Sequence, residues 1–217
     1  MGFKKEQNIE REKEMDIIDE IKSKMATIIE KRNCTDLLYI ASLSMCRTNQ
    51  IIYMLAENEY LCDIRCLNDY IEKELCNYEN INHIIKNSGV EAFLMESPEL
   101  LENMEYDANR VLYIAYDLCE SWYNFSNLLN YGCDEDDKYD LVDYITLPLH
   151  LLDIYVSDEI FINEKEQNFL EQKVRLDRRI IAEEQRIFND LEIMIDKDVY
   201  HKYFSKYKDE NILILDE

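Results

Sequence analysis

The sequence predicts an all-α fold, a single-domain bundle of about seven to nine helices. Three observations predict it. The 217-residue chain has only 3 Gly and 2 Pro, so it lacks the residues on which hairpins and tight turns depend. Apolar residues recur at steps of three and four along most of the chain, as they do on amphipathic helices. No shift in composition marks a second domain within residues 1 to 217.

The N-terminal part reads as three helices. In residues 9 to 32, isoleucines and a methionine recur between charged residues, which predicts an amphipathic helix that could lie at the periphery of the bundle. Thr35 is the predicted N-cap of a second helix that reaches about Glu57. A third helix is expected at about 60 to 77.

The central helix is predicted to be buried. Ser97 and Pro98 form a helix start, and Gly132 suits the C′ position, so residues 105 to 131 belong to one long helix. On a helical wheel an apolar row that includes Trp122 merges with a row of tyrosines, Tyr113, Tyr116 and Tyr123. A helix that is apolar over most of its circumference is typical of a bundle interior, and an exposed tyrosine surface is the alternative. Only a narrow wedge is polar, and it carries Arg110, Asp117, Ser121 and Asn124.

The C-terminal part begins with the acidic loop "DEDDKYD". A helix is expected from this loop to about Val156, with Pro148 inside it. A last long helix is predicted from Ser157 or Asp158 to about Asp196, and residues 208 to 217 are predicted to form an extended tail.

The net charge of -23 is concentrated in the middle of the chain. Residues 91 to 166 contain 19 acids and 3 bases, a local charge of -16. Such a field disfavours nucleic acids and anionic membranes and favours encounter with a basic protein. General solubility is the alternative explanation. The candidate partner-binding residues are Glu96, Glu99, Glu102, Glu105, Tyr106, Asp134, Glu135, Asp136, Asp137, Tyr139, Asp140 and Asp143.

Two patterns resemble parts of a metal site, and neither predicts a metal or cofactor. His150 and Asp153 lie one turn apart, but Asp143 is too distant to complete a zinc site, so His150 is interpreted as a surface histidine flanked by carboxylates. Cysteines 62, 66 and 76 share a helix stripe yet form no closed ligand set. A second packed helix that covers this stripe explains these cysteines better.

An enzyme is the alternative function. The spacing of Glu99, Glu102 and Glu105, with Asp140 and Asp143, resembles the paired carboxylates with which all-helical nucleotide pyrophosphohydrolases bind magnesium. The second pair lacks its glutamate, and no basic cluster is available for a triphosphate. Catalysis is therefore the less favoured interpretation.

The cysteines and the hydropathy pattern bear on the compartment. Seven cysteines without a recognisable framework are interpreted as reduced thiols, and no apolar run is long enough to predict a membrane span or a cleaved signal. We therefore expect a cytoplasmic protein. The oligomeric state does not follow from the sequence.

Three stretches, "DANRVLYIAYDLCESW", "DYITLPLHLLDIYVSDE" and "AEEQRIFNDLEIM", resemble in order and spacing the uncharacterised YjaG-like all-helical family. The matching positions are Asp107, Ala108, Asp153, Tyr155, Val156, Glu184 and Gln185. An early stretch, "CRTNQIIY", keeps Arg47 and Asn49 but lacks the proline and the adjacent tyrosine of the family pattern. The resemblance implies a helical bundle over about residues 35 to 196 and brings no catalytic residue. The predicted function is that of an acidic interaction protein, for example a bacterial immunity protein or antitoxin that masks a basic partner.

Overall fold

A computed structural model describes residues 16–48, 110–131, 134, 136–164, 170–194, 196–207 and 212. This part of the chain contains seven helices and no strand, so the predicted all-α class is confirmed. Predictions that concern residues 1 to 15 and 49 to 109, including the helix at 60 to 77 and the cysteine stripe, lie outside the described residues.

The first helix, α1 (Ile17–Ile29), begins after Asp16, whose side chain accepts a hydrogen bond from a first-turn backbone N–H at 2.8 Å. This N-cap satisfies one of the donors that a helix start leaves without a partner. The helix packs against α8 and α10 and buries Ile21 and Met25. The amphipathic helix is therefore present, with a later start than residue 9 because the cap lies at Asp16.

The second helix, α2 (Cys34–Arg47), is capped by Asn33 rather than by the predicted Thr35. The Asn33 side-chain oxygen accepts the Asp36 N–H at 2.8 Å, and its amide donates to the Asp36 carboxylate at 3.0 Å. Both contacts require a residue three positions before Asp36, which is the position of Asn33 and not of Thr35. The helix ends at Arg47 with Thr48 as its C-cap, which is earlier than predicted.

Helix α7 (Arg110–Tyr131) ends immediately before Gly132, as predicted. Trp122 is 1% exposed, and its ring lies edge-on to Phe125 with the ring centroids 6.2 Å apart. The fully described buried row consists of Ile114, Leu118, Trp122 and Phe125. Tyr123 is half-buried against the core, which fits the core-rim interpretation. The side chains of Tyr113 and Tyr116 are outside the described residues, so the claim that this helix is the most buried one stays a prediction.

Helix α8 (Lys138–Glu164) follows the acidic loop and runs through Pro148. The predicted end near Val156 is wrong, because the helix continues for two further turns. Val156 is fully buried within it. No turn residue interrupts the helical pattern there, and the serine that follows is accommodated as an ordinary helical residue.

The predicted last helix from 157 to 196 is also wrong. It is replaced by the end of α8 and by the separate helices α9 (Leu170–Arg175) and α10 (Arg178–Glu192). Asp177 makes the break between α9 and α10, since its side chain accepts the Arg179 N–H at 2.8 Å and caps α10. A further helix, α11 (Lys197–Tyr207), lies between the predicted last helix and the predicted tail, in a stretch for which no element was predicted.

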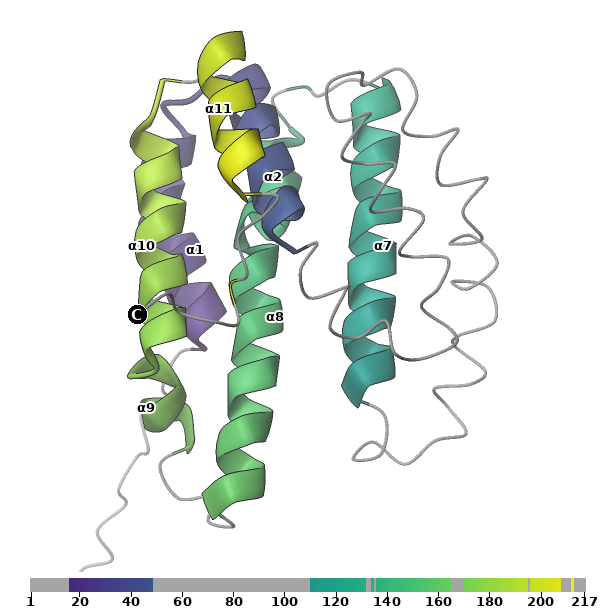
Figure 1. The fold of residues 1–217 in the computed structure, drawn as a ribbon. Coiled ribbons are helices and arrows are strands. Elements are labelled where there is room, and N and C mark those ends of the chain that lie inside the picture. The colour runs from purple at the N-terminus through teal and green to yellow at the C-terminus, as the bar shows by residue number, and fades with distance from the viewer. Residues whose placement is uncertain are drawn as a thin grey trace, which may run out of the picture.

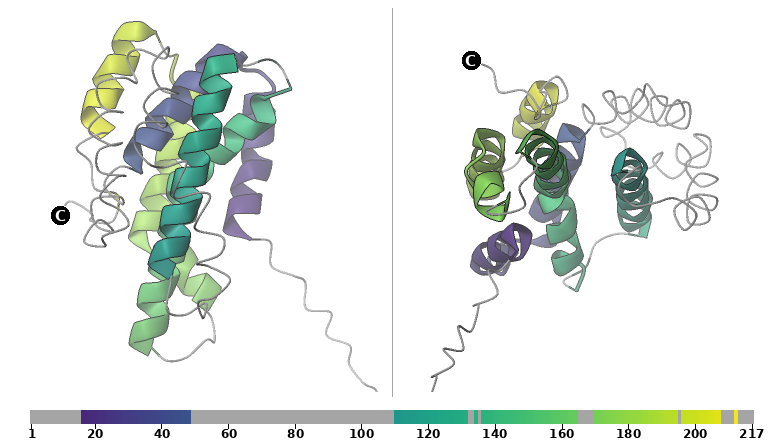
Figure 2. Two further views of the ribbon diagram at one scale, coloured as in Figure 1. Left: turned by 90° about the vertical axis from the view of Figure 1, so that its right-hand side faces the viewer. Right: turned by 90° about the horizontal axis from the view of Figure 1, so that it is seen from below.

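The helices are arranged around α8, which packs against α1, α2, α7, α9 and α10 (Figure 1). Helix α11 packs on α2. Helix α7 runs along α8 on the side away from α10 (Figure 2). The core is continuous through these helices, and Ile212 of the predicted tail is buried in it. Two faces result that bear on function: the α7–α8 side and the α10 side.

Two of the seven cysteines can be described. Cys46 is a buried thiol, whereas Cys34 is disulfide-bonded. The prediction that all cysteines are reduced is therefore wrong at Cys34. Its position at the first residue of α2 gave no signal of pairing, because disulfide connectivity depends on the fold and not on spacing.

Candidate functional site

The connection between α7 and α8 is an acidic turn ordered by its own carboxylates. The Asp134 N–H donates to the Asp137 carboxylate at 2.7 Å, and the Asp136 N–H donates to the Asp134 carboxylate at 2.8 Å. The Leu141 N–H then donates to the Asp137 carbonyl at 3.1 Å as α8 begins. Negative side chains are favourable at a helix N-terminus, so this segment can hold a dense charge without distortion.

Beside this turn lies a cavity of about 740 Å³ between α7 and α8. Its described lining includes five carboxylates and no basic residue: Glu120, Asp134, Asp137, Asp140 and Asp143. Ser121 and Asn124 contribute polar side chains from α7. Two residues of the polar wedge that the sequence places on the central helix therefore line this cavity.

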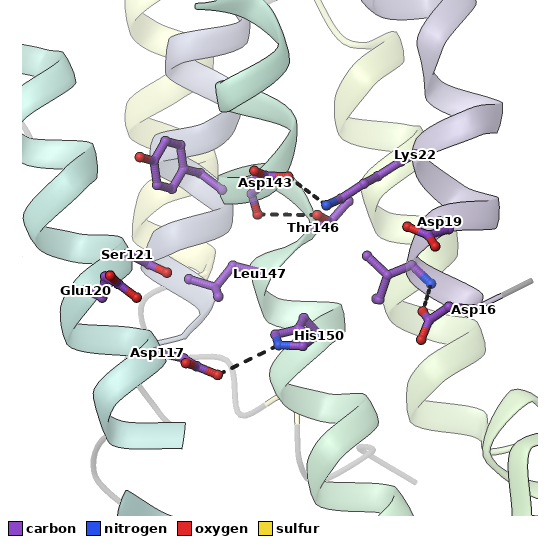
Figure 3. Close-up of a pocket in the computed structure, with 12 residues that line it drawn as sticks. Asp16, Asp19, Lys22, Asp117, Glu120, Ser121, Asp143, Thr146, Leu147 and His150 are labelled. Carbon is purple, nitrogen blue, oxygen red and sulfur yellow. Dashed lines mark hydrogen bonds and ion pairs between the residues drawn. The ribbon is translucent and has the colours of Figure 1, made fainter. Parts of the chain in front are cut away.

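A second cavity of about 450 Å³ lies further along α8 and is lined by residues of α1, α7 and α8 (Figure 3). The two cavities share Glu120, Ser121, Asp143 and Tyr144. We call the combined feature the acidic groove. The second cavity adds Asp16, Asp19 and Asp117 to its carboxylates and brings in Lys22 and His150.

Two contacts cross the second cavity. Lys22 of α1 donates to the Asp143 carboxylate at 2.6 Å, and His150 Nε2 lies 3.8 Å from Asp117 Oδ2 of α7 (Figure 3). His150 is half-exposed beside a carboxylate, as interpreted from the sequence. The neighbouring carboxylate, Asp117, belongs to α7. The spacing of residues within α8 could not predict a contact with another helix.

Tyr144 reports the electrostatic character of the acidic groove. Its ring packs against Phe125 with centroids 5.0 Å apart. Burial raises the pKa of Tyr144 to about 12, and the charges of Asp140, Asp143 and Glu120 contribute to this rise. A phenol surrounded by carboxylates resists becoming an anion itself. The same field attracts a cation.

The candidate residues from the sequence are only partly brought together. Asp134, Asp137, Asp140 and Asp143 line the acidic groove, while Asp136 and the 66% exposed Tyr139 lie on the adjacent surface. The remaining candidates lie outside the described residues: Glu96, Glu99, Glu102, Glu105, Tyr106 and Glu135. Sequence reasoning missed Asp117 and Glu120 of α7 as groove residues. The polar wedge on an otherwise apolar helix was the signal for Asp117, whereas Glu120 was not part of that wedge.

A second cluster of charges is centred on three buried residues, Arg47, Glu183 and Asp190, and we call it the buried ionic network. Arg47 donates to Glu183 at 2.9 Å and to Asp190 at 2.6 Å, and Tyr207 donates to the other Asp190 oxygen at 2.6 Å. Arg186 donates to Glu183 at 3.0 Å. The network joins α2, α10 and α11. Burial works against the charged Arg47 guanidinium, but the two carboxylates outweigh it and raise its pKa above the ordinary arginine value.

The described residues contain no group of three or more histidines, cysteines or acids placed to hold a metal ion. Asp140 and Asp143, the second pair of the pyrophosphohydrolase-like pattern, line the acidic groove. The first pair of that pattern lies outside the described part of the chain.

Among the described helices, none is both long enough and apolar enough to span a membrane. Comparisons with protein families, with characterised proteins and with solved structures found no match to this chain. The resemblance to the YjaG-like family therefore stays a prediction, and its Arg47 position coincides with the centre of the buried ionic network.

Proposed function

We propose that the protein binds a basic protein partner through the acidic groove, in the manner of a bacterial immunity protein or antitoxin that masks a cationic surface. The observation that carries the proposal is the set of five carboxylates, without a described basic residue, that lines the α7–α8 cavity. A basic partner would gain both a faster encounter and a fixed register from this field.

Two further features support a role of the acidic groove in binding a partner, rather than in solubility alone. The acidic turn is held by its own hydrogen bonds, so a partner would meet a surface that is already ordered. Tyr139, 66% exposed, stands beside the carboxylates and offers an aromatic anchor, which charged rims need for tight binding. The Lys22 contact with Asp143 supports the same view, because an ammonium group already fits the groove.

The same field opposes the phosphates of nucleic acids, so these are not proposed as partners. A carboxylate-metal enzyme is the second candidate, favoured only by the spacing of Asp140 and Asp143 in the groove. A cytoplasmic location was expected from reduced cysteines, and the disulfide at Cys34 is more typical of an oxidising compartment. The proposed binding chemistry is the same in either compartment.

Association kinetics with a basic partner, isolated by low-salt affinity capture and then purified, tests the proposal. The test variant is Asp134→Asn with Asp136→Asn and Asp140→Asn, since asparagine keeps the turn hydrogen bonds and removes the charge. Its association rate at low salt should fall by at least about tenfold, with a weaker salt dependence.

The matched control removes the same number of charges from exposed sites at the ends of other helices: Glu30→Gln, Asp196→Asn and Asp198→Asn. It should retain nearly the wild-type rate, because distant charges are screened. Equal slowing in both variants would show that only net charge matters and would overturn the proposed groove. A magnesium-dependent hydrolysis of nucleoside triphosphates, abolished by Asp140→Asn, would instead favour the enzyme.

A further inference from the structure

Helix α10 lies at the edge of the bundle, on the side of α8 away from α7 (Figure 2). Its inner face is buried in the core through Ile180 and Ile187. The opposite face is open to solvent, because Gln185 and Asn189 are exposed and Ile181 is 37% exposed. We call this opposite face the outer face of α10, and it consists of Arg178, Ile181, Gln185, Phe188, Asn189 and Glu192.

The outer face is arranged evenly about Gln185. Successive residues of a helix are about 100° apart, so all members of this face lie within about 60° of Gln185 around the helix axis. Arg178 lies seven residues before Gln185 and Glu192 lies seven residues after it, so opposite charges stand at equal distances from this centre. Ile181 and Phe188 lie four residues before and three residues after it, together on one side of the face.

A surface hollow of about 430 Å³ lies on this side of the outer face, and Ile181 and Phe188 contribute its apolar lining. Glu184 also lines the hollow, and its carboxylate accepts a hydrogen bond from Lys24 of α1 at 3.2 Å. Phe188 is packed only partly against the core. The hollow can therefore receive an apolar side chain from a neighbouring molecule.

The two charged residues of the outer face are available to a partner molecule. In the described part of the chain, neither Arg178 nor Glu192 has an ion-pair partner, whereas the neighbouring Arg179 binds Asp177 and Glu159. A single exposed ion pair contributes little free energy, but a cation and an anion at matching positions fix the register of an interface. The outer face carries both, at its two ends.

We propose that the outer face of α10 packs against the same face of a second copy of this chain, with the two helices antiparallel and a twofold axis beside Gln185. A twofold interface is self-complementary, so each of its contacts occurs twice. Arg178 then lies at the height of Glu192 of the other copy. Phe188 lies within about 1.5 Å of the height of Ile181 of the other copy, on the same side of the interface. The two Gln185 amides meet at the axis and can exchange hydrogen bonds.

The expected dimer is weak. A single pair of 15-residue helices buries less surface than a stable dimer does, and the charge of -23 on each copy opposes association. Moderate salt screens this long-range repulsion and affects close contacts less, so it should strengthen the dimer. The proposal does not depend on the function of the acidic groove, whose α7–α8 cavity lies on the other side of α8.

Sedimentation equilibrium of the full chain, from micromolar to millimolar concentration at an ionic strength of about 0.15 M, tests the proposal. The average mass should rise with concentration from that of one copy towards that of two. Arg178→Glu should raise the dimer dissociation constant at least about tenfold, because it places like charges opposite each other at two symmetric positions. Glu192→Arg should have the same effect for the same reason.

The combined variant, Arg178→Glu with Glu192→Arg, tests the register of the interface. It forms both ion pairs again with reversed sign, so it should restore nearly the wild-type dissociation constant. All three variants should fold, because an acid in the first turn and a base in the last turn of a helix are both favourable.

Lys202→Glu is the control, because it changes the charge as Arg178→Glu does, at an exposed position of α11 outside the outer face of α10. It should leave the dissociation constant nearly unchanged. The proposal would be overturned by the mass of a single copy at every concentration, by equal weakening in Arg178→Glu and Lys202→Glu, or by no recovery in the combined variant.

Discussion

The buried ionic network and the acidic groove use charge in opposite ways. In the network, Arg47 is completely buried and its guanidinium contacts two carboxylates and the Ser44 hydroxyl. In the groove, carboxylates gather at a solvated surface, and Asp143 is 65% exposed even though Lys22 contacts it. The network balances each charge at short range, and the groove leaves a field that extends into solvent.

The difference shows what each region contributes. Burying charges costs free energy that only close pairing offsets, so the network requires that α2, α10 and α11 meet in one arrangement. Clustered surface carboxylates cost little desolvation energy, and their mutual repulsion offsets the favourable position that they hold at the N-terminus of α8, so their charges add little net stability. A cluster that does not stabilise the fold is better explained by recognition.

The largest effect is expected from breaking the network. Arg47→Met should lower the free energy of unfolding by about 3 to 5 kcal/mol, because Glu183 and Asp190 would remain buried without their cation. Urea denaturation measures it, with exposed Arg178→Met as the control. Adding Asp190→Asn to Arg47→Met should cost less than the sum of the single changes. A loss below about 1 kcal/mol for Arg47→Met would contradict a structural role for the network.

A comparable loss in the free energy of unfolding is expected when a buried apolar side chain of α7 is removed. Trp122→Ala removes a ring that is 1% exposed and should cost about 3 to 5 kcal/mol, since the cavity can collapse only partly. Hydrogen exchange gives an independent check on α7. Fast exchange across residues 111 to 125, relative to α2 and α8, would show that the interior assignment of this helix is wrong.

The disulfide at Cys34 is a covalent link that is expected to contribute less to the free energy of unfolding than the buried ionic network does. Thiol titration in denaturant without reductant should find fewer than seven thiols, and all seven after reduction. Cys34→Ser should lower the free energy of unfolding by about 2 to 4 kcal/mol under oxidising conditions and have little effect under reducing ones. Seven reactive thiols before reduction would restore the reduced, cytoplasmic interpretation.

Alkaline titration probes the groove side. The pKa of Tyr144 is raised to about 12, above its usual value near 10, so the folded state favours the neutral phenol. The resulting stability is complete below about pH 10 and is lost as pH rises through about 12. Tyr144→Phe should therefore lose less stability than wild type over this interval. Glu120→Gln should lower the pKa of Tyr144, and an unchanged profile would contradict the assigned field.

The two regions also differ in how well the sequence predicted them. The all-α class, the acidic loop and the end of α7 followed from local patterns and from Gly132, and these signals act within a few residues. The break at Asp177 was missed because an N-cap aspartate within an acidic, periodic run looks like any other acid. The network was not foreseen because Arg47 meets Glu183 across 136 residues of chain, a pairing set by tertiary packing alone.

The most direct test of this comparison needs no partner. Urea denaturation at low salt measures the free energy of unfolding of the variant Asp134→Asn, Asp136→Asn and Asp140→Asn. The groove charges should be dispensable for folding, so the variant should be as stable as wild type or slightly more stable, because repulsion is relieved while the turn hydrogen bonds remain. A loss of about 3 kcal/mol, comparable to that of Arg47→Met, would show that the acidic groove is part of the architecture and not a surface kept for binding.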